Sequence, residues 1–272
     1  MAALSVLMSV YIREKPEYAD ECFKSLLAQT VTADEWVIVE DGPLTEELYS
    51  LLDRYQADNP GLIRRIVLDE NRGLGSALAV GVPACKNDLI ARMDTDDIAR
   101  PDRFAKQLDL FERDPQLDIC GSNIDEFEDD KDHIVAKRTV PASHEDIVRY
   151  QKRRDGFNHM TVLFRKKAVL DAGNYRSCPL MEDTYLWVRM IQNGAKCANI
   201  DESLVYVRIG RDMFGRRGGW SYFRKYRTGR KMVLKTGFIS RWDYIYTLMI
   251  QFFVALAPGW IRRLIFTKLL HR

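Results

Sequence analysis

Short apolar segments alternate with longer segments of helical periodicity along the first half of the chain. The apolar segments are rich in aliphatic and β-branched residues, as buried strands are, and they cover residues 3–10, 35–39, 62–68, 89–93 and 117–122. Between them, apolar residues recur every three or four positions, which predicts helices after Pro16 and over residues 46–55, 74–84 and 101–113. This order of elements predicts an α/β fold with a largely parallel central sheet and helices on both faces.

The pattern becomes irregular after residue 123. An acidic loop is expected over residues 126–132, strands over 162–164, 196–200 and 204–208, and a helix over 184–192. We expect one domain over residues 1–207 and a basic helical tail over residues 208–272. Parallel strands joined by right-handed crossovers end at one edge of their sheet, so we expect ligands to bind at that edge.

The composition is that of a globular chain, but its charges are unevenly distributed. Hydrophobic residues make up 46% and charged residues 29%, which excludes disorder, collagen-like sequence and a polytopic membrane protein. The net charge of +2 combines 26 basic and 37 acidic residues before residue 208 with 15 basic and two acidic residues from there onward. Five scattered cysteines, without a Cys-x-x-Cys pair, favour reduced thiols in a cytoplasmic protein.

The basic tail predicts an anionic partner. Residues 244–261 carry no charge, and Pro258-Gly259 interrupts them after 14 residues, which is short for a membrane-spanning helix. We therefore expect the tail to bind an anionic membrane surface through its basic and apolar side chains. The alternative is that C-terminal helices pack on the domain or on another subunit. No nucleic-acid recognition motif accompanies the basic residues, so nucleic acid is not an expected partner.

Three carboxylates follow the predicted strand over residues 89–93. Asp94, Asp96 and Asp97 stand within four residues and repel one another unless a cation lies among them. Carboxylate oxygens are ligands that Mg²⁺ and Mn²⁺ accept, and such a metal neutralises the charge of a nucleotide diphosphate leaving group. The alternative is a solvated acidic loop at the start of the helix over residues 101–113.

Other candidate residues also stand at predicted strand or helix ends. Asp41 could accept a hydrogen bond from a base or a ribose, although its alternative role is to stabilise the turn with Gly42. Tyr11 could stack on a nucleobase, or it could belong to the core or to the rim of a site. Glu182 and Asp183 precede a predicted helix, where acidic pairs ordinarily serve as caps, but either could act as a general base.

Taken together, these motifs resemble those of the family 2 glycosyltransferases. The resemblance covers nearly the whole of residues 5–190, through SVLMSVY, SLLAQT, EWVIVEDGP, NRGLGSAL, LIARMDTDDIARPDRF, FNHMTVLFRKKAVLDAGNY and MEDTYLWVRM. The later GRRGGW string resembles the amylovoran-type glycosyltransferases of bacterial exopolysaccharide biosynthesis. The resemblance implies the Rossmann-like GT-A fold, a nucleotide-diphospho-sugar donor and inversion at the anomeric carbon.

The resemblance also implies contacts with the donor. Asp41 would contact the uracil or the ribose, and Tyr11 would lie beside the base. Asp94 and Asp96 would face the ribose and the diphosphate. Arg208, which closes the last predicted strand, would touch the diphosphate. A UDP-sugar is therefore the expected donor, bound mainly by residues 1–123.

Metal binding and catalysis are assigned in the same way. Asp97, with Asp96, would hold Mg²⁺ or Mn²⁺, while Asp183 matches the catalytic base and Glu182 its companion. Residues 124–207 would bind the acceptor, which we expect to be a lipid-linked saccharide. The protein would then lie in the cytoplasm, peripherally on the cytoplasmic face of the inner membrane.

The chain departs from the motif of the processive family members, which add many sugars in succession. Processive members carry Gln-x-x-Arg-Trp, but the window ending at Trp220 has Arg216 in place of Gln and Gly219 in place of Arg, which favours addition of a single sugar. One alternative function is a sugar nucleotidyltransferase, although no glycine-rich basic loop follows the first strand. Another is a catalytically inactive module that binds sugar nucleotides.

Overall fold

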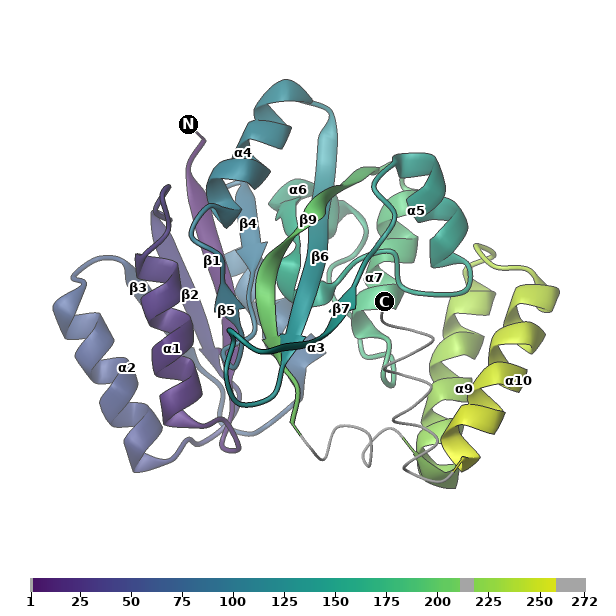
Figure 1. Cartoon of the computed structure of the whole chain (residues 1–272), viewed down its shortest axis with the longest axis horizontal. Coiled ribbons are helices and arrows are strands. Elements are labelled where there is room, and N and C mark those ends of the chain that lie inside the picture. The colour runs from purple at the N-terminus through teal and green to yellow at the C-terminus, as the bar shows by residue number, and fades with distance from the viewer. Residues whose placement is uncertain (1, 211–217, 258–272) are drawn as a thin grey trace.

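A nine-stranded sheet forms the centre of residues 2–210 and 218–257, which the computed structural model describes (Figure 1). The strands run in the order β3-β2-β1-β4-β8-β6-β9-β5, with β7 paired to β6. Their bounds are β1 Leu4–Val10, β2 Glu35–Glu40, β3 Ile63–Val67, β4 Leu89–Arg92, β5 Ile98–Ala99, β6 Leu117–Phe127, β7 Ile134–Arg138, β8 Leu163–Arg165 and β9 Lys196–Arg208. The predicted parallel arrangement is confirmed for β3, β2, β1 and β4, while β8 runs antiparallel to both of its neighbours.

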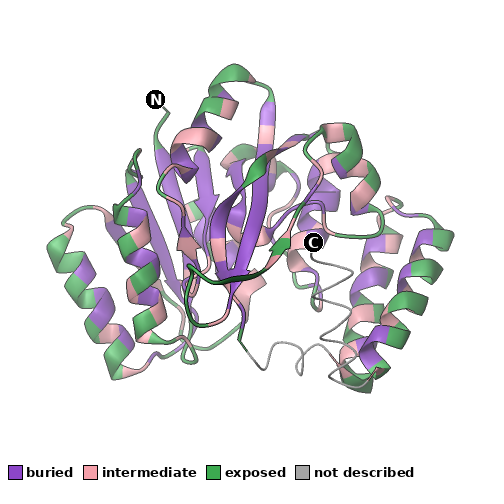
Figure 2. Ribbon diagram, viewed as in Figure 1, coloured by how far each residue is buried: buried purple, intermediate pink, exposed green. Residues whose placement is uncertain are grey.

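Helices cover both faces of the sheet, as predicted. One face carries α1 (Pro16–Leu27), α2 (Glu46–Asp58) and α4 (Arg103–Arg113), and the other carries α3 (Leu74–Ala84), α5 (His144–Gln151), α6 (Lys166–Asp171) and α7 (Glu182–Gln192). Successive residues of β2 point to opposite faces, so Trp36 and Ile38 lie in one core and Val37 and Val39 in the other. Most strand residues are therefore buried between two layers of helices (Figure 2). All five cysteines are buried and free, which fits the expectation of reduced thiols.

The last part of the sheet differs from the sequence expectation in one strand. Two strands were expected over residues 196–200 and 204–208, but β9 is continuous and pairs in parallel with β6. The pairing shifts at Ser122 and Asn123, because Asp201 and Glu202 are two extra residues on β9 at that point. These two polar residues interrupt the apolar pattern, although they do not end the strand.

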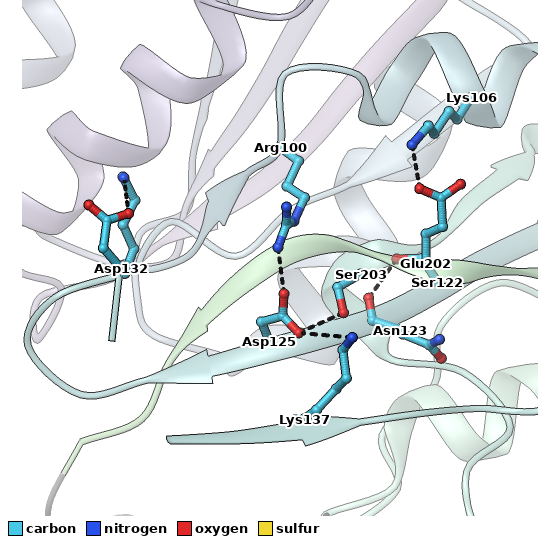
Figure 3. Close-up of polar contacts among 10 residues, drawn as sticks. Arg100, Lys106, Ser122, Asn123, Asp125, Asp132, Lys137, Glu202 and Ser203 are labelled. Carbon is cyan, nitrogen blue, oxygen red and sulfur yellow. Dashed lines mark hydrogen bonds and ion pairs between the residues drawn. The ribbon is translucent and has the colours of Figure 1, made fainter. Parts of the chain in front are cut away.

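A carboxylate of β6 fixes the strands around this irregularity. Asp125 accepts a hydrogen bond from Arg100 at 2.5 Å and from Ser203 of β9 at 2.8 Å, and it lies 3.7 Å from the ammonium of Lys137 (Figure 3). Arg100 directly follows the two-residue strand β5, which pairs antiparallel with β9. Since Ile98 is opposite Tyr206 in that pairing, Arg208 lies beside the acidic residues that precede β5.

A helical hairpin lies at the opposite end of the molecule from α2 (Figure 1). It consists of α9 (Gly219–Lys235) and α10 (Arg241–Leu256). Val233 and Ile239 of the hairpin pack with Val188 of α7, so part of the tail packs on the domain, as the alternative interpretation of the tail proposed. Within the described ranges, no helix is both long enough and apolar enough to cross a membrane. Parts of the predicted tail, residues 211–217 and 258–272, lie outside the described residues and include the first half of the GRRGGW string and the Pro258-Gly259 break.

Candidate active site

The acidic cluster follows β4 at the carboxyl edge of the sheet. Asp94, Asp96 and Asp97 each offer a carboxylate oxygen, and these oxygens all lie within 4.8 Å of one another. Both carboxylate oxygens of Asp94 accept hydrogen bonds from the Arg92 guanidinium, one of them at 2.5 Å. Asp97 accepts a hydrogen bond at 3.0 Å from the backbone N–H of Arg208. Asp96 and Asp97 are consequently freer than Asp94 to bind another cation.

The electrostatics of this cluster suit a divalent metal. Burial, followed by the charges of Asp96 and Asp94, raises the pKa of Asp97 well above its usual value. Burial and the charge of Asp94 also raise the pKa of Asp96. Carboxylates in this state are costly to ionise unless a positive charge lies among them, and hard oxygen ligands suit Mg²⁺ or Mn²⁺. The residues present therefore fit the metal that their spacing predicts.

Arg208 lies beside the acidic cluster, as its position at the end of β9 requires. Its Nε donates to the backbone carbonyl of Asp96 at 3.3 Å, and its guanidinium pairs with Glu21. The guanidinium also lies over the ring of Tyr18, 4.0 Å from the ring centroid. Arg208 is thus held where it could meet an anionic group bound near the cluster.

Asp41 and Tyr11 directly follow the neighbouring strands β2 and β1. The carboxylate of Asp41 accepts hydrogen bonds from the backbone N–H groups of Arg72 at 2.7 Å and Gly73 at 2.9 Å. Gly42 has a φ of +85°, and a Cβ there would lie 2.5 Å from the backbone nitrogen of Asn71. The turn after β2 is therefore packed against the loop before α3, and Asp41 has the stabilising role that the sequence left open. Its carboxylate keeps lone pairs for a further donor, and Tyr11 is 38% exposed at the end of β1.

Glu182 and Asp183 form the first turn of α7. Asp183 Oδ1 accepts from the backbone N–H of Thr184 at 2.7 Å. Burial and then the charges of Asp155 and Glu182 raise the pKa of Asp183 to about 8. A carboxyl group with such a pKa is suited to accept a proton near neutral pH. A Cβ on Gly75 would lie 3.0 Å from Cβ of Glu182, so glycine lets the start of α3 approach this pair.

No role was predicted for Arg92, whose positive charge acts on both acidic groups. Its side chain is 1% exposed, and its charge opposes the rise in pKa of Asp97, Glu182 and Asp183, which indicates that it lies near all three. Its Nε has no hydrogen-bond partner among the described residues. An arginine within the apolar segment over residues 89–93 was a usable signal, because a buried guanidinium needs carboxylates around it.

The arrangement of sheet, helices and acidic cluster is that of a glycosyltransferase with the GT-A fold, and the comparisons with known proteins agree. The sequence profile of "Glycosyl transferase family 2" matches residues 5–170. The chain therefore belongs to glycosyltransferase family 2.

Two curated relatives match nearly the whole chain. The amylovoran biosynthesis glycosyltransferase AmsE of Erwinia amylovora is 38% identical over 97% of this chain and 98% of its own length. An Escherichia coli enzyme, UDP-Gal:alpha-D-GlcNAc-diphosphoundecaprenol beta-1,3-galactosyltransferase, is 34% identical over 98% of this chain and 96% of its own. Both matches extend through the hairpin, beyond the part that the family profile covers.

A solved structure shows the same fold. It is that of the mannosyltransferase PcManGT from Pyrobaculum calidifontis in complex with GDP-Man and Mn²⁺. The TM-score is 0.65 at 13% identity, over 93% of this chain and 69% of that chain. At this level of identity the likeness extends to the fold and not to the ligands.

Proposed function

We propose that this glycosyltransferase transfers one sugar, with inversion, from a UDP-sugar to a saccharide carried on a lipid diphosphate, in the biosynthesis of a surface polysaccharide. The observation that carries the proposal is the meeting of two acidic groups, the cluster after β4 and the Glu182–Asp183 pair, at one edge of the sheet around Arg92. The names of the two curated relatives support the polysaccharide pathway and the lipid-diphosphate acceptor.

The donor is proposed to bind along the ends of the parallel strands. Tyr11 and Asp41 would receive the nucleoside, and Asp94 would hold Arg92 against the site. Asp96 and Asp97 would hold Mg²⁺ or Mn²⁺, which, when bound, neutralises the charge of the departing diphosphate. Arg208, anchored by its backbone to Asp97, would face the same diphosphate.

Asp183 is proposed to act as the general base, with Glu182 as its companion. As the acceptor hydroxyl oxygen bonds to the anomeric carbon, the bond from that carbon to the diphosphate oxygen breaks, and the hydroxyl proton passes to the Asp183 carboxylate. The charge of Glu182 helps to raise the pKa of Asp183, which strengthens Asp183 as a proton acceptor. The single displacement inverts the configuration of the donor sugar.

We further propose that the hairpin binds the cytoplasmic face of the inner membrane. The α10 stripe consists of exposed apolar residues that recur every three or four positions, namely Trp242, Ile245, Tyr246, Met249, Ile250, Phe253 and Leu256. The neighbouring helix α9 exposes basic side chains, including Arg224, Lys225, Arg227 and Lys231. An apolar stripe beside basic residues suits an anionic lipid surface, while the opposite face of the hairpin packs on the domain.

The test of the proposed function is a transfer assay with purified full-length protein, Mn²⁺ and a panel of UDP- and GDP-sugars. The acceptor is N-acetylglucosamine on a polyprenyl diphosphate. Release of UDP that requires the acceptor is expected. Synthesis of a nucleotide sugar from a sugar phosphate and a nucleoside triphosphate would instead indicate a nucleotidyltransferase. Donor binding without any transfer would indicate an inactive sugar-nucleotide-binding module.

A further inference from the structure

A cavity lies between the domain and the hairpin. Its volume is about 770 Å³, which is within the range of about 300–1,000 Å³ that small-molecule sites occupy. Helix α5 and the residues after it form one wall, the start of α7 lies at its base, and α9 and α10 close the other side. None of the residues proposed to bind the donor lines this cavity.

The charged residues that line the cavity are predominantly basic. Five arginines line it, against two aspartates, Asp146 and Asp155. Arg149 pairs with Asp146 at 3.2 Å and Arg153 with Asp243 at 2.7 Å, but 78% and 55% of their side chains remain accessible, so their other guanidinium nitrogens can still donate to a ligand. Arg230 is 2% exposed, and its guanidinium donates to the backbone carbonyl of Lys152 at 2.8 Å. A pocket with several guanidinium groups suits a phosphate or diphosphate, to which arginine can donate two parallel hydrogen bonds.

The opposite wall of the cavity is continuous with the α10 stripe. Tyr246 and Ile250 line the cavity and also belong to the stripe, where they are 48% and 47% exposed. Arg153 lies over the Tyr246 ring, 4.7 Å from its centroid, at the point where the basic and apolar walls meet. A ligand with an anionic group and a long apolar chain therefore has a path from the cavity onto the surface proposed to face the membrane.

The floor of the cavity lies next to Asp183, the proposed general base. Thr184 and Asp155 line the cavity, and the Thr184 hydroxyl donates to the Asp155 carboxylate. Thr184 directly follows Asp183, and Asp155 is the charged residue that contributes most to the raised pKa of Asp183. The cavity therefore reaches the residue next to Asp183 on α7.

We propose that this cavity binds the diphosphate of a polyprenyl-diphosphate-linked acceptor. The arginines at its mouth hold the diphosphate, the acceptor sugar points toward Asp183, and the polyprenyl chain leaves over Tyr246 and Ile250. The inference rests on the proposed function, which supplies a lipid-diphosphate acceptor, and it adds the place where that acceptor binds. The donor and acceptor diphosphates are then held on different sides of Asp183, one through the acidic cluster and the other directly by arginines.

The first experiment measures binding and does not require transfer. The full-length protein is titrated with a short polyprenyl diphosphate in neutral detergent, with the corresponding polyprenol and with phosphatidylglycerol as comparison ligands. The diphosphate is expected to bind more tightly than either. The Arg149→Gln, Arg153→Gln double variant should bind it on the order of 10- to 100-fold more weakly, as expected for the loss of charge-assisted hydrogen bonds.

A matched control is available on another helix. Arg113 is 75% exposed and pairs with Asp109 of its own helix, just as Arg149 pairs with Asp146. Arg113→Gln should leave the affinity for polyprenyl diphosphate unchanged. Equal affinity of the double variant and the wild type would overturn the proposal, as would equal affinity of the wild type for phosphatidylglycerol and the diphosphate.

A second experiment separates this inference from the proposed function. Transfer is measured to N-acetylglucosamine on a polyprenyl diphosphate and to an alkyl glycoside of the same sugar without a diphosphate. The double variant should raise the KM of the first acceptor on the order of tenfold or more and leave the second acceptor and the donor KM unchanged. Equal losses with both acceptors would overturn the inference. Binding that depends on the arginines, in a protein that transfers no sugar, would support the cavity and refute the proposed function.

Discussion

The two sides of Asp183 are built from opposite charges. On the sheet side, three aspartates converge within 4.8 Å around the end of β4. On the hairpin side, five arginines and two aspartates line a cavity between the domain and the tail. The donor proposed for the first region and the acceptor proposed for the second both carry a diphosphate. The two regions therefore show two ways to bind a diphosphate. One uses a cation held by carboxylates, and the other uses guanidinium groups directly.

The positive charge of Arg92 offsets part of the repulsion among the carboxylates on the sheet side of Asp183. Arg92 is buried, forms two hydrogen bonds to Asp94, and lies near enough to Asp97 and Asp183 to oppose the rise in their pKa values. In the arginine cavity, Arg149 and Arg153 pair with Asp146 and Asp243, and both arginines are also exposed to solvent. The predictions that follow test the two sides separately.

The largest effect is expected where the two sides meet. Asp183→Asn removes the proton acceptor and retains the size of the side chain, so transfer should fall by about 10²- to 10⁴-fold while the UDP-sugar still binds. Acceptor-dependent UDP release and donor calorimetry measure the two quantities. Asp171→Asn, an exposed aspartate paired with Lys167, is the control and should be fully active. Normal turnover of Asp183→Asn would show that another group accepts the proton.

The second largest effect is expected at the acidic cluster after β4, where the metal is proposed to bind. Asp97→Asn removes a proposed metal ligand, and a bound metal contributes several kcal/mol to stabilising a departing diphosphate, so turnover should fall on the order of 10²-fold. Donor affinity should also lose its dependence on Mn²⁺, as measured by calorimetry with and without the ion. Asp109→Asn should retain both properties. Full turnover of the wild type in EDTA would exclude a metal from the reaction.

Membrane binding tests the α10 stripe, the apolar surface of the hairpin that borders the arginine cavity. Phe253→Glu places a charge in the α10 stripe and should weaken binding to phosphatidylglycerol vesicles, measured by flotation, by about tenfold or more. Val67→Glu is the matched control, because Val67 is 63% exposed and Phe253 67%, but Val67 lies on β3. Equal flotation of the two variants would count against the stripe as the membrane-binding surface.

The smallest effect concerns the pH dependence of transfer. Asp183 must be ionised to accept a proton, so its pKa of about 8 predicts that kcat/KM rises through the neutral range and levels off above pH 8. Asp155→Asn removes a negative charge that raises this pKa, so the midpoint should move to lower pH by up to about one unit. Asp146→Asn, at the other aspartate of the cavity, should leave the midpoint in place. A midpoint that moves upward in Asp155→Asn would contradict the proposed electrostatics.

The sequence predicted the regular part of the fold and the positions of its acidic residues. The alternation up to residue 122 identified β1 to β4, β6 and their helices, because each of these strands has an apolar segment of its own. It missed β5, which has two residues and no measurable period, and β7, whose residues are mostly exposed. It also divided β9 at Asp201 and Glu202, because a bulge in a strand has the same polar pattern as a turn.

The proposed site was predicted less completely than the fold. Asp94 to Asp97 and Asp183 could be found because carboxylates at strand and helix ends are visible in the sequence. Asp155 and the arginines of the cavity could not, because α5 and the hairpin meet only in the folded chain. Arg92 lay in a recognised strand, but the need for a partner for its buried charge became evident only when Asp94 and Asp183 were placed around it.

The stereochemistry of the product tests the central claim most directly. The protein is incubated with Mn²⁺, an α-linked UDP-sugar that it accepts, and N-acetylglucosamine on a polyprenyl diphosphate, and the product is examined by NMR and mass spectrometry. The account predicts a single added sugar in β-linkage, with one UDP released for each bond formed. An α-linked product, or a ladder of several added sugars, would contradict a single inverting displacement with Asp183 as the base.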